Sequence, residues 1–341
     1  MYQLFRPVLF RFAPERVHEA TLYLLNLIGR LTPLRTLLSS IFSVSRSPVD
    51  AFGLTFANPL GLAAGYDKDG LAWRGLASLG FGHIEIGTIT PRPQPGNPRP
   101  RIFRLVEDRA LINRMGFPGR GADFVAKQLQ SSRPNDLIVG ANLGINKDTH
   151  LDHAVEDYLI LMRVLSPLAD YLAINVSSPN TLGLRRLQAK KALNALLSTI
   201  NQERRKHEVR LGKSIPVLVK LSPDLSQSEL DDALDVILST EMDGVIATNT
   251  TTQREGLKSK FAHETGGLSG EPLSERSTQV VRWIYQRTMG KVPIIGSGGV
   301  MRTSDVQAKL DAGAVLVQVY TGLVYNGPGF VKRVFSEIKG Y

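Results

Sequence analysis

The sequence contains no cysteine among its 341 residues. Disulfides, cysteine-ligated iron–sulfur clusters, cysteine-type zinc sites and a catalytic thiolate are therefore all excluded. No stretch reaches the roughly 18 consecutive apolar residues that a membrane-spanning helix needs. A secretory signal is also missing, because Arg6, Arg11, Glu15 and Arg16 interrupt any apolar core and no small-residue cleavage site follows. These absences predict a protein of the cytoplasm, or of the cytoplasmic face of the cell (inner) membrane.

The composition is that of a globular protein, with 43% hydrophobic and 21% charged residues. The length fits one α/β barrel of about 250 residues with an appendage. A formal net charge of +10 points to an acidic partner, which could be nucleic acid, an anionic membrane or an anionic substrate and cofactor. The basic run at 204–206 has no interleaved aromatic residues and no nucleic-acid motif accompanies it, so we interpret it as a solvated helix face and predict no nucleic-acid partner.

Residues 1–48 form a segment of different character, with six arginines and two glutamates. Apolar side chains recur at helical spacing up to Phe12, and Pro14 opens a second helix. An amphipathic, arginine-rich helical pair of this kind suits a peripheral position on anionic lipid. The alternative is that these helices simply cap the bottom of the following domain.

From residue 49 to residue 341 short apolar runs alternate with longer amphipathic stretches, which is typical of repeated βα units. Several runs lack polar alternation, as expected for strands covered on both faces. The eight runs are 60–64, 83–88, 137–142, 171–175, 217–221, 244–249, 293–296 and 315–320. The predicted fold class is therefore α/β, a (β/α)₈ TIM barrel with an N-terminal amphipathic helical extension.

Polar residues follow these runs, where an α/β barrel carries its reactive groups. Asparagine and threonine at such places are usually turn formers or helix caps, but that does not account for all eight strand ends. Glycine-rich turns at 296–299 and 320–322 are suited to binding a phosphate. Met301 stands where a dinucleotide fingerprint needs its third glycine, so a monophosphate cofactor is favoured over NAD or ATP.

Individual side chains suggest roles. The amides of Asn113, Asn180 and Asn249 offer donors and acceptors to a planar heterocycle. Lys68 can pair with a substrate carboxylate, and Lys220 can stabilise negative charge that develops on a reduced ring. Either lysine could instead be a surface charge.

Several ordered motifs closely resemble the dihydroorotate dehydrogenases, from about residue 50 to the C-terminus. They are Ala64-Gly-Tyr-Asp-Lys-Asp-Gly70, Thr88-Ile-Thr-Pro-Arg-Pro-Gln-Pro-Gly96, Leu111-Ile-Asn-Arg-Met-Gly-Phe117, Asn175-Val-Ser-Ser-Pro-Asn-Thr-Leu-Gly-Leu-Arg185, Gly244-Val-Ile-Ala-Thr-Asn-Thr-Thr251 and Thr265-Gly-Gly-Leu-Ser-Gly270.

The resemblance implies FMN as the cofactor. The matched cofactor residues are Ala64, Thr88, Asn142, Asn175, Lys220, Thr248, Gly270, Gly299, Tyr320 and Thr321. The matched residues for dihydroorotate are Lys68, Asn113, Arg114, Met115, Gly116, Phe117, Asn175, Asn180, Asn249 and Thr250. No metal is implied, and His150 and His153 lack a third ligand nearby.

The family divides by catalytic base: soluble members use a cysteine, and membrane-associated, quinone-linked members use a serine. Without cysteine, and with Ser178 at the serine position, this chain resembles the second class, and residues 1–48 match its quinone entrance. The implied reaction of de novo pyrimidine biosynthesis moves a proton from C5 of dihydroorotate to Ser178 and a hydride from C6 to flavin N5, and electrons then pass to a membrane quinone. Serine is a weak base, so placement, exclusion of water and a relay through Thr181 are expected to assist it.

Two departures from the family pattern, Leu182 for a common proline and Ile145 for a common lysine, concern the stiffness of loops rather than the reaction. The alternatives are a fumarate-linked or NAD-linked member, a tRNA-modifying flavin barrel, and a non-catalytic nucleic-acid-binding or membrane-scaffold protein. The missing cysteine opposes the first two. The polar groups at every strand end oppose the last. A monomer is expected.

Overall fold

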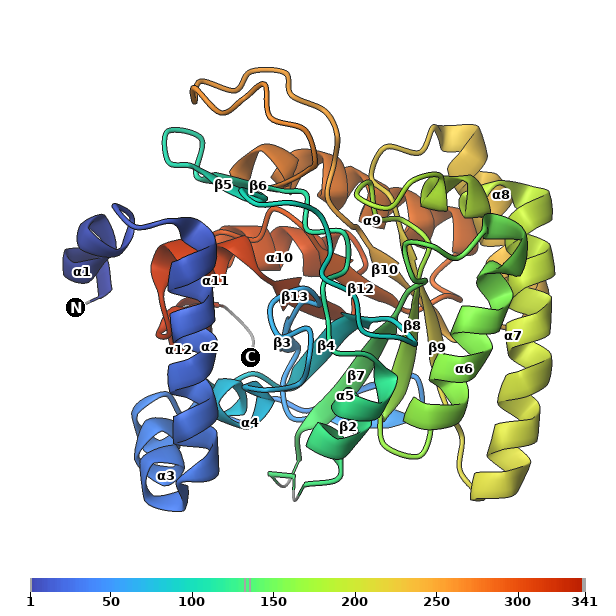
Figure 1. Cartoon of the computed structure of the whole chain (residues 1–341), viewed down its shortest axis with the longest axis horizontal. Coiled ribbons are helices and arrows are strands. Elements are labelled where there is room, and N and C mark those ends of the chain that lie inside the picture. The colour runs from blue at the N-terminus through green and yellow to red at the C-terminus, as the bar shows by residue number, and fades with distance from the viewer. Residues whose placement is uncertain (1, 132, 135, 339–341) are drawn as a thin grey trace.

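The computed structural model describes residues 2–131, 133–134 and 136–338, and its centre is a closed barrel of eight parallel strands (Figure 1). Around the barrel the strands are hydrogen-bonded in the order β10-β12-β13-β3-β4-β7-β8-β9. Their bounds are β3 Leu60–Leu62, β4 His83–Ile89, β7 Ile138–Leu143, β8 Tyr171–Asn175, β9 Val217–Leu221, β10 Gly244–Ala247, β12 Ile294–Ser297 and β13 Leu316–Val319. Each predicted apolar run overlaps one of these strands to within a few residues at either end, so the (β/α)₈ prediction is confirmed.

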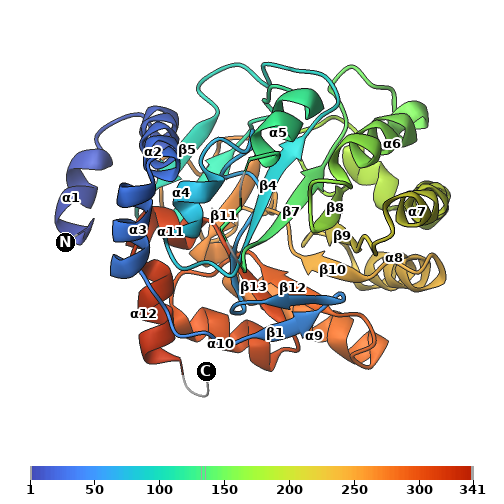
Figure 2. The ribbon, with the colours of Figure 1, turned by 90° about the horizontal axis from the view of Figure 1, so that it is seen from below.

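Helices surround the barrel and cover the outer face of its strands (Figure 2). They are α4 Trp73–Ala77, α5 Ala122–Leu129, α6 Ala154–Leu165, α7 Lys190–Leu211, α8 Gln227–Ser239, α9 Ser274–Thr288, α10 Thr303–Asp311, α11 Thr321–Asn326 and α12 Phe330–Glu337, with short 3₁₀ turns at Leu151–His153, Leu184–Gln188 and Glu271–Leu273. Local sequence sets their ends. Helix α8, for example, starts at a capping box in which the side chains and backbone N–H groups of Ser226 and Glu229 bond reciprocally.

A hairpin closes the N-terminal end of the barrel. Strands β1 (Val49–Ala51) and β2 (Leu54–Phe56) pair antiparallel and lie across this end (Figure 2). Phe56 is fully buried and packs edge-on against His83 inside the barrel, with ring centroids 5.3 Å apart. The bottom is therefore capped by the hairpin and not by the N-terminal helices, contrary to the alternative raised from the sequence.

A three-stranded antiparallel sheet stands beyond the carboxyl ends of the barrel strands. It consists of β5 (Ile102–Leu105), β6 (Ala110–Asn113) and β11 (Gly267–Gly270), in the order β11-β6-β5. Asn113 is paired with Gly267 in the register of β6 and β11. The sheet thus brings a residue of the first third of the chain beside the loop that follows β10.

The N-terminal segment forms three helices beside the barrel: α1 (Tyr2–Leu9), α2 (Pro14–Arg30) and α3 (Thr32–Ile41) (Figure 1). We call residues 2–41 the head. Helix α2 packs closely on α4, because a Cβ atom on Gly75 would lie 2.1 Å from the carbonyl oxygen of Leu25. The third helix was not predicted. Among the described residues no helix is long and apolar enough to cross a membrane.

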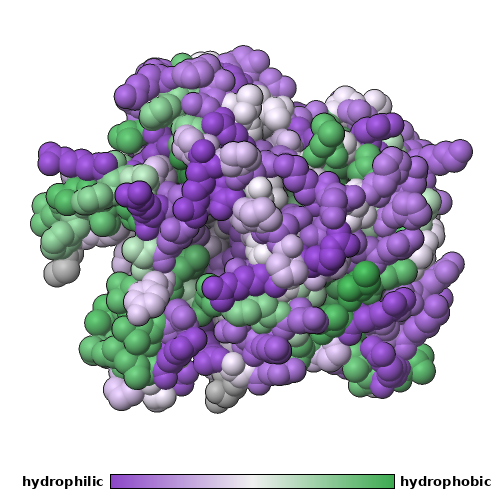
Figure 3. Space-filling model, viewed as in Figure 1, coloured by the Kyte–Doolittle hydropathy of each residue, from purple (hydrophilic) through white to green (hydrophobic). Residues whose placement is uncertain are grey.

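The head carries most of the large apolar side chains that remain in contact with solvent. Green atoms gather over α1 and α3 at the left of the molecule (Figure 3). The exposed apolar residues of this segment are Leu4, Phe5, Val8, Phe12, Tyr23, Leu24, Leu27, Leu31, Leu34, Leu37 and Ile41. An apolar surface of this extent on one element typically marks an interaction surface.

Candidate active site

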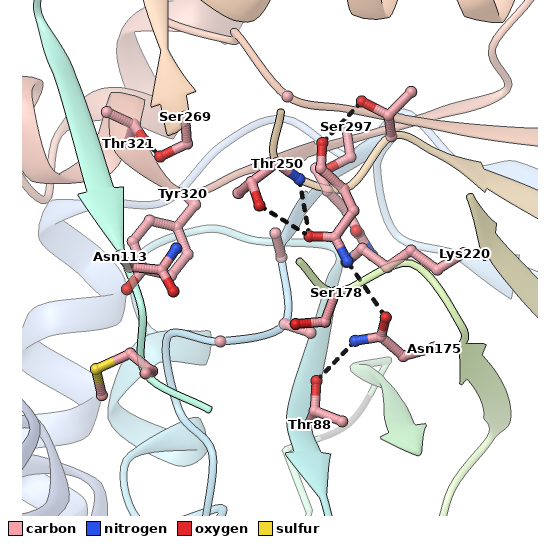
Figure 4. Close-up of a pocket in the computed structure, with 18 of the residues that line it drawn as sticks. Thr88, Asn113, Asn175, Ser178, Lys220, Thr250, Ser269, Ser297, Tyr320 and Thr321 are labelled. Carbon is pink, nitrogen blue, oxygen red and sulfur yellow. Dashed lines mark hydrogen bonds between the residues drawn. The ribbon is translucent and has the colours of Figure 1, made fainter. Parts of the chain in front are cut away.

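A cavity opens at the carboxyl ends of the barrel strands, where the sequence predicted the site. Figure 4 shows its lining. The predicted residues that line it are Ala64, Lys68, Thr88, Asn113, Met115, Gly116, Phe117, Asn175, Ser178, Asn180, Lys220, Thr248, Asn249, Thr250, Gly299, Tyr320 and Thr321. Residues from the carboxyl ends of seven of the eight barrel strands, all except β7, therefore meet around one space.

The floor of the cavity is a chain of amide and hydroxyl groups. Asn175 Nδ2 donates to Thr88 over 2.9 Å (Figure 4). Thr88 in turn donates to Asn142 Oδ1 over 2.6 Å. Asn249 Nδ2 in turn donates to Asn175 Oδ1 over 3.2 Å. Because each amide is held by a neighbour, its remaining donor or acceptor has a fixed direction. Asn142 itself lies behind Thr88 and does not line the cavity.

Ser178 lies in the loop after β8. It is buried, and its Oγ accepts a hydrogen bond from the backbone N–H of Asn180 over 3.2 Å. Among the hydrogen bonds of the described ranges, none joins Ser178 to Thr181, so a direct relay between these two hydroxyls is not formed here. Leu182 is 98% exposed, so no packing contact replaces the stiffness of a proline at this position.

An ion pair ties the Ser178 loop to the neighbouring loops. Arg185 donates to the backbone oxygen of Ser177 over 3.1 Å, to that of Thr250 over 3.0 Å, and to Asp224 over 2.8 Å. Asp224 also accepts from the hydroxyl of Thr251 over 2.5 Å. These hydrogen bonds hold the pKa of Asp224 below its usual value although burial opposes them. Arg185 and Asp224 therefore form a clamp between the serine loop and the Asn249–Thr250 turn.

The far wall carries the groups predicted to hold the substrate. Asn180 Nδ2 donates to Asn113 Oδ1 over 3.1 Å, and the backbone N–H of Thr250 donates to Asn249 Oδ1 over 2.8 Å. Lys68 Nζ donates to the backbone oxygen of Gly65 over 2.6 Å. Burial, and secondarily the charge of Arg101, lowers the pKa of Lys68 to about 8. The ammonium group is thus present at neutral pH and can pair with an anion.

Arg114 lies apart from the other predicted substrate residues. Its guanidinium pairs with Glu264 over 2.5 Å and stacks over Phe103 at 4.5 Å from the ring centroid. It does not line the cavity, nor does Gly270. Arg114 therefore joins β6 to the long loop before β11, and the backbone of the same turn, through Met115 to Phe117, reaches the cavity.

Glycines shape the opposite flank. Gly298 and Gly299 have φ of +94° and +73°, values that other residues rarely adopt. A Cβ atom on Gly299 would lie 2.1 Å from Ser274 Cα, at the start of α9. Ser269 and Thr321 share a hydrogen bond of 2.8 Å where α11 begins (Figure 4). Backbone N–H groups of such loops can approach a phosphate closely.

Sequence reasoning missed several lining residues, and one buried residue beneath them. The missed lining residues are Ala63, Gly65, Ser269, Leu273, Val300 and Gln318, together with Ser297 and Gly298, which were predicted only as part of a phosphate turn. The buried one is Glu85, which pairs with Lys220 over 3.3 Å. The available signal was a polar residue at an inward position of an otherwise apolar strand, which applies to Glu85 and Gln318.

A second, mostly apolar cavity lies between the head and the barrel. It is lined by Tyr2, Leu9, Phe10, Pro14, Val17, His18, Thr21, Leu24, Leu25, Ile28, Leu38, Phe42, Tyr66, Leu79, Ile102, Arg104, Leu111, Tyr320, Leu323, Val324, Gly327 and Pro328. Tyr320 lines both cavities. Burial, and secondarily the charge of Lys68, lowers the pKa of His18 to about 3, so its ring is neutral. This cavity suits an apolar ligand.

The head is fixed to the barrel by a buried ion pair. Glu15 on α2 accepts from Arg101 over 2.8 Å and from Arg99 over 3.2 Å. The hydroxyl of Tyr2 donates to the backbone oxygen of Val324 over 2.6 Å. Within the described ranges no group of three or more metal-binding side chains occurs. His150 and His153 are exposed and lie beside Asp152 and Glu156 respectively.

Residues 47–341 match the family model described as dihydroorotate dehydrogenase. The chain belongs to the dihydroorotate dehydrogenase family. Two curated relatives are both named dihydroorotate dehydrogenase (quinone). One from Christiangramia forsetii is 45% identical over 99% of this chain and 98% of its own length. One from Roseiflexus castenholzii is 47% identical over 98% of this chain and 90% of its own length. These matches confirm the resemblance stated from the motifs.

Solved structures agree with the family assignment. The crystal structure of DHODH from Eimeria tenella in complex with ferulenol has a TM-score of 0.85 and 39% sequence identity, and it covers 95% of this chain and 90% of that one. A ligand-free crystal structure of the Eimeria enzyme has a TM-score of 0.82 and 41% identity. The matches with the quinone-linked relatives include the head, since they extend over nearly the whole chain. The dihydroorotate dehydrogenase family consists of flavoenzymes.

Proposed function

We propose that this dihydroorotate dehydrogenase oxidises dihydroorotate to orotate in de novo pyrimidine biosynthesis, with FMN as the bound cofactor and a membrane quinone as the final electron acceptor. The observation that carries the proposal is the pair of cavities that share Tyr320, one polar at the strand ends and one apolar beneath the head. The polar substrate dihydroorotate and the apolar quinone each need an entrance of matching polarity.

The residues around the polar cavity fit FMN. The Gly298–Gly299 turn and the start of α11 supply backbone N–H groups for a monophosphate. The amides and hydroxyls of the floor match a planar ring with alternating carbonyl and N–H groups. Gln318 adds a buried carbonyl oxygen that has no hydrogen-bond partner among the described residues. We therefore assign the lining residues Ala64, Thr88, Asn175, Lys220, Thr248, Gly299, Tyr320 and Thr321 to the cofactor. Asn142 and Gly270, which do not line the cavity, are assigned to the support of Thr88 and Thr321.

The substrate side supports the following chemistry. When bound, FMN supplies the hydride acceptor N5 for C6 of dihydroorotate and a route for the electrons to the quinone. Lys68 pairs with the substrate carboxylate, and the amides of Asn113, Asn180 and Asn249 orient the ring. Ser178 Oγ takes the proton from C5 while its own hydroxyl proton passes to water. The Asn180 N–H, which points at Ser178 Oγ, stabilises negative charge on that oxygen while the proton moves.

The N-terminal segment 1–48, which includes the head, is proposed as a separate functional segment attached to the catalytic barrel, 49–341. Its exposed apolar side chains and its arginines favour peripheral contact with anionic lipid at the cytoplasmic face of the cell (inner) membrane. A quinone dissolved in that membrane would then enter the apolar cavity directly. We propose a monomer as the active unit.

The assignment of Ser178 is tested by comparing wild-type protein with the Ser178→Ala variant in anaerobic reduction by dihydroorotate. We expect the variant to retain FMN and to lose at least about a hundredfold in the rate of flavin bleaching, the range typical of a positioned general base. Reduction by dithionite should be unaffected. A variant that bleaches at the wild-type rate would remove Ser178 from the mechanism.

A fumarate-linked enzyme is the second candidate for the oxidative half-reaction. The apolar cavity beneath the head opposes it, because fumarate is a dianion and would have to lose its hydration there.

A further inference from the structure

Glu85 is a fully buried carboxylate in the middle of the barrel, and four side chains from four other strands donate to it. Asn142 on β7 and Lys220 on β9 donate to Oε1 over 2.8 and 3.3 Å. Tyr171 on β8 and Gln318 on β13 donate to Oε2 over 3.0 and 2.8 Å. Every oxygen of this carboxylate therefore has two donors.

The position of Glu85 is costly for a charge. The layer of the barrel interior below it is apolar and is formed by residues such as Leu218, Ile246, Ile295 and Leu316. Moving a carboxylate into such an environment costs several kcal/mol, and a well-packed hydrophobic side chain is often at least as stabilising as a buried ion pair. Stability alone does not explain a glutamate here. A role in the chemistry of the cavity directly above Glu85 does explain it.

The two oxygens of Glu85 lead to the cavity by different routes. Oε1 holds the ammonium group of Lys220, which lines the cavity where the flavin ring is proposed to lie. Oε2 holds the amide nitrogen of Gln318, and this leaves Gln318 Oε1 buried, without a partner and at the cavity wall. In a Glu85→Gln variant, an amide N–H₂ group would face some of these donors, and such a group does not accept hydrogen bonds.

Other titratable groups near Glu85 are neutral. Burial raises the pKa of Tyr171 well above its usual value. His83, two residues earlier on the same strand face, has its pKa lowered by burial to about 4. Lys220 is thus the one opposite charge in contact with Glu85 within the described ranges.

We propose that Glu85 is a positioning residue that fixes the ammonium group of Lys220 and the amide of Gln318 against the flavin and, through the Lys220 charge, sets the reduction potential of the bound cofactor. This proposal rests on the FMN assignment above. The negative charge of Glu85 partly compensates the positive charge of Lys220. Without it, the reduced and negatively charged flavin is stabilised more strongly, and the potential rises.

The test is the midpoint potential of the FMN-loaded protein, measured by anaerobic photoreduction against a reference dye, without dihydroorotate or quinone. We expect the Glu85→Gln variant to favour the reduced flavin at least tenfold more than wild type, which is a rise of about 30 mV for a two-electron couple.

Two controls separate the proposed role from a general effect of substitution. Glu203 on α7 is a buried carboxylate paired with Arg163 on the outer helices, so Glu203→Gln should leave the potential unchanged. If Glu85 acts through Lys220, adding Glu85→Gln to a Lys220→Met variant should shift the potential much less than Glu85→Gln alone does.

Tyr171→Phe covers the case in which Glu85→Gln does not fold. This substitution removes one hydrogen-bond donor from the carboxylate at a residue that does not line the cavity. Less of the negative charge of Glu85 is then neutralised, so the reduction potential should fall. The fall should correspond to less than a tenfold change in the equilibrium constant for flavin reduction. A flavin-loaded Glu85→Gln protein with the wild-type potential would overturn this proposal alone, as would an unchanged potential in Tyr171→Phe. Wild-type protein that binds no FMN would overturn the cofactor assignment as well.

Discussion

The clamp formed by Arg185 predicts a large kinetic effect from a small substitution. In Arg185→Lys the charge and the pairing with Asp224 can remain, but a single ammonium group does not reach the three acceptors that the guanidinium spans. The bonds to the backbone oxygens of Ser177 and Thr250 are lost. Two hydrogen bonds from a charged donor contribute about 3 kcal/mol together.

If the loss of these bonds destabilises the ordered Ser178 loop by that free energy, the loop is correctly placed about a hundredfold less often, since each 1.4 kcal/mol changes an equilibrium constant about tenfold. We expect the rate of flavin bleaching by dihydroorotate, followed by stopped-flow absorbance, to fall by about that factor. FMN content should be unchanged. The matched control is Arg186→Lys, because Arg186 is the exposed neighbour and should tolerate the change. A wild-type bleaching rate in Arg185→Lys would refute the clamp.

Three further predictions concern the cavity lining and the head. Because the pKa of Lys68 is about 8, its charge is present below that pH and is lost above it. We therefore expect kcat/KM for dihydroorotate to fall about tenfold per pH unit above ~8. Lys68→Arg should remove this fall, and a flat profile in the wild-type protein would contradict the assignment of Lys68. Gly299→Ala should abolish FMN retention, measured as flavin per chain. The control is Gly256→Ala, which should retain FMN, because Gly256 has a similar φ of +75° and an added Cβ atom there would have nothing within 4 Å. Equal flavin contents in the two variants would refute the steric role of Gly299. Glu15→Gln should leave Arg101 buried without its counter-ion and weaken the packing of the head on the barrel by about 3 kcal/mol. The KM for quinone should then rise, while bleaching of the flavin by dihydroorotate persists. Cleavage of the head at the wild-type rate in limited proteolysis would contradict this prediction.

The barrel was predictable because its strands are apolar on both faces. Runs such as 171–175 and 217–221 need no alternation when helices cover one side and the barrel interior the other. The site followed from the geometry of parallel strands, since residues after the strands must meet at one end. Helix α3 was missed because it begins only two residues after α2 ends, and a single continuous apolar pattern covers both.

The missed polar residues have a different cause. Glu85 and Gln318 lie inside strands that were identified by their apolar character, so the same pattern that revealed the strands concealed their polar members. Arg114 illustrates the converse: a residue within a matching motif can direct its side chain away from the site, and only the packing against Glu264 reveals this. The choice between Ser177 and Ser178 rested on the resemblance, because adjacent serines are chemically equivalent in a sequence.

Electron exchange between two partners through one flavin, from separate cavities, can be measured by running the two half-reactions in sequence on the full chain. Purified protein would be reduced anaerobically with dihydroorotate while flavin absorbance is followed, and then mixed with a soluble quinone or with fumarate. We expect bleaching by dihydroorotate and recovery with quinone alone. Recovery with fumarate instead, or a flavin that dihydroorotate does not bleach, would contradict this expectation.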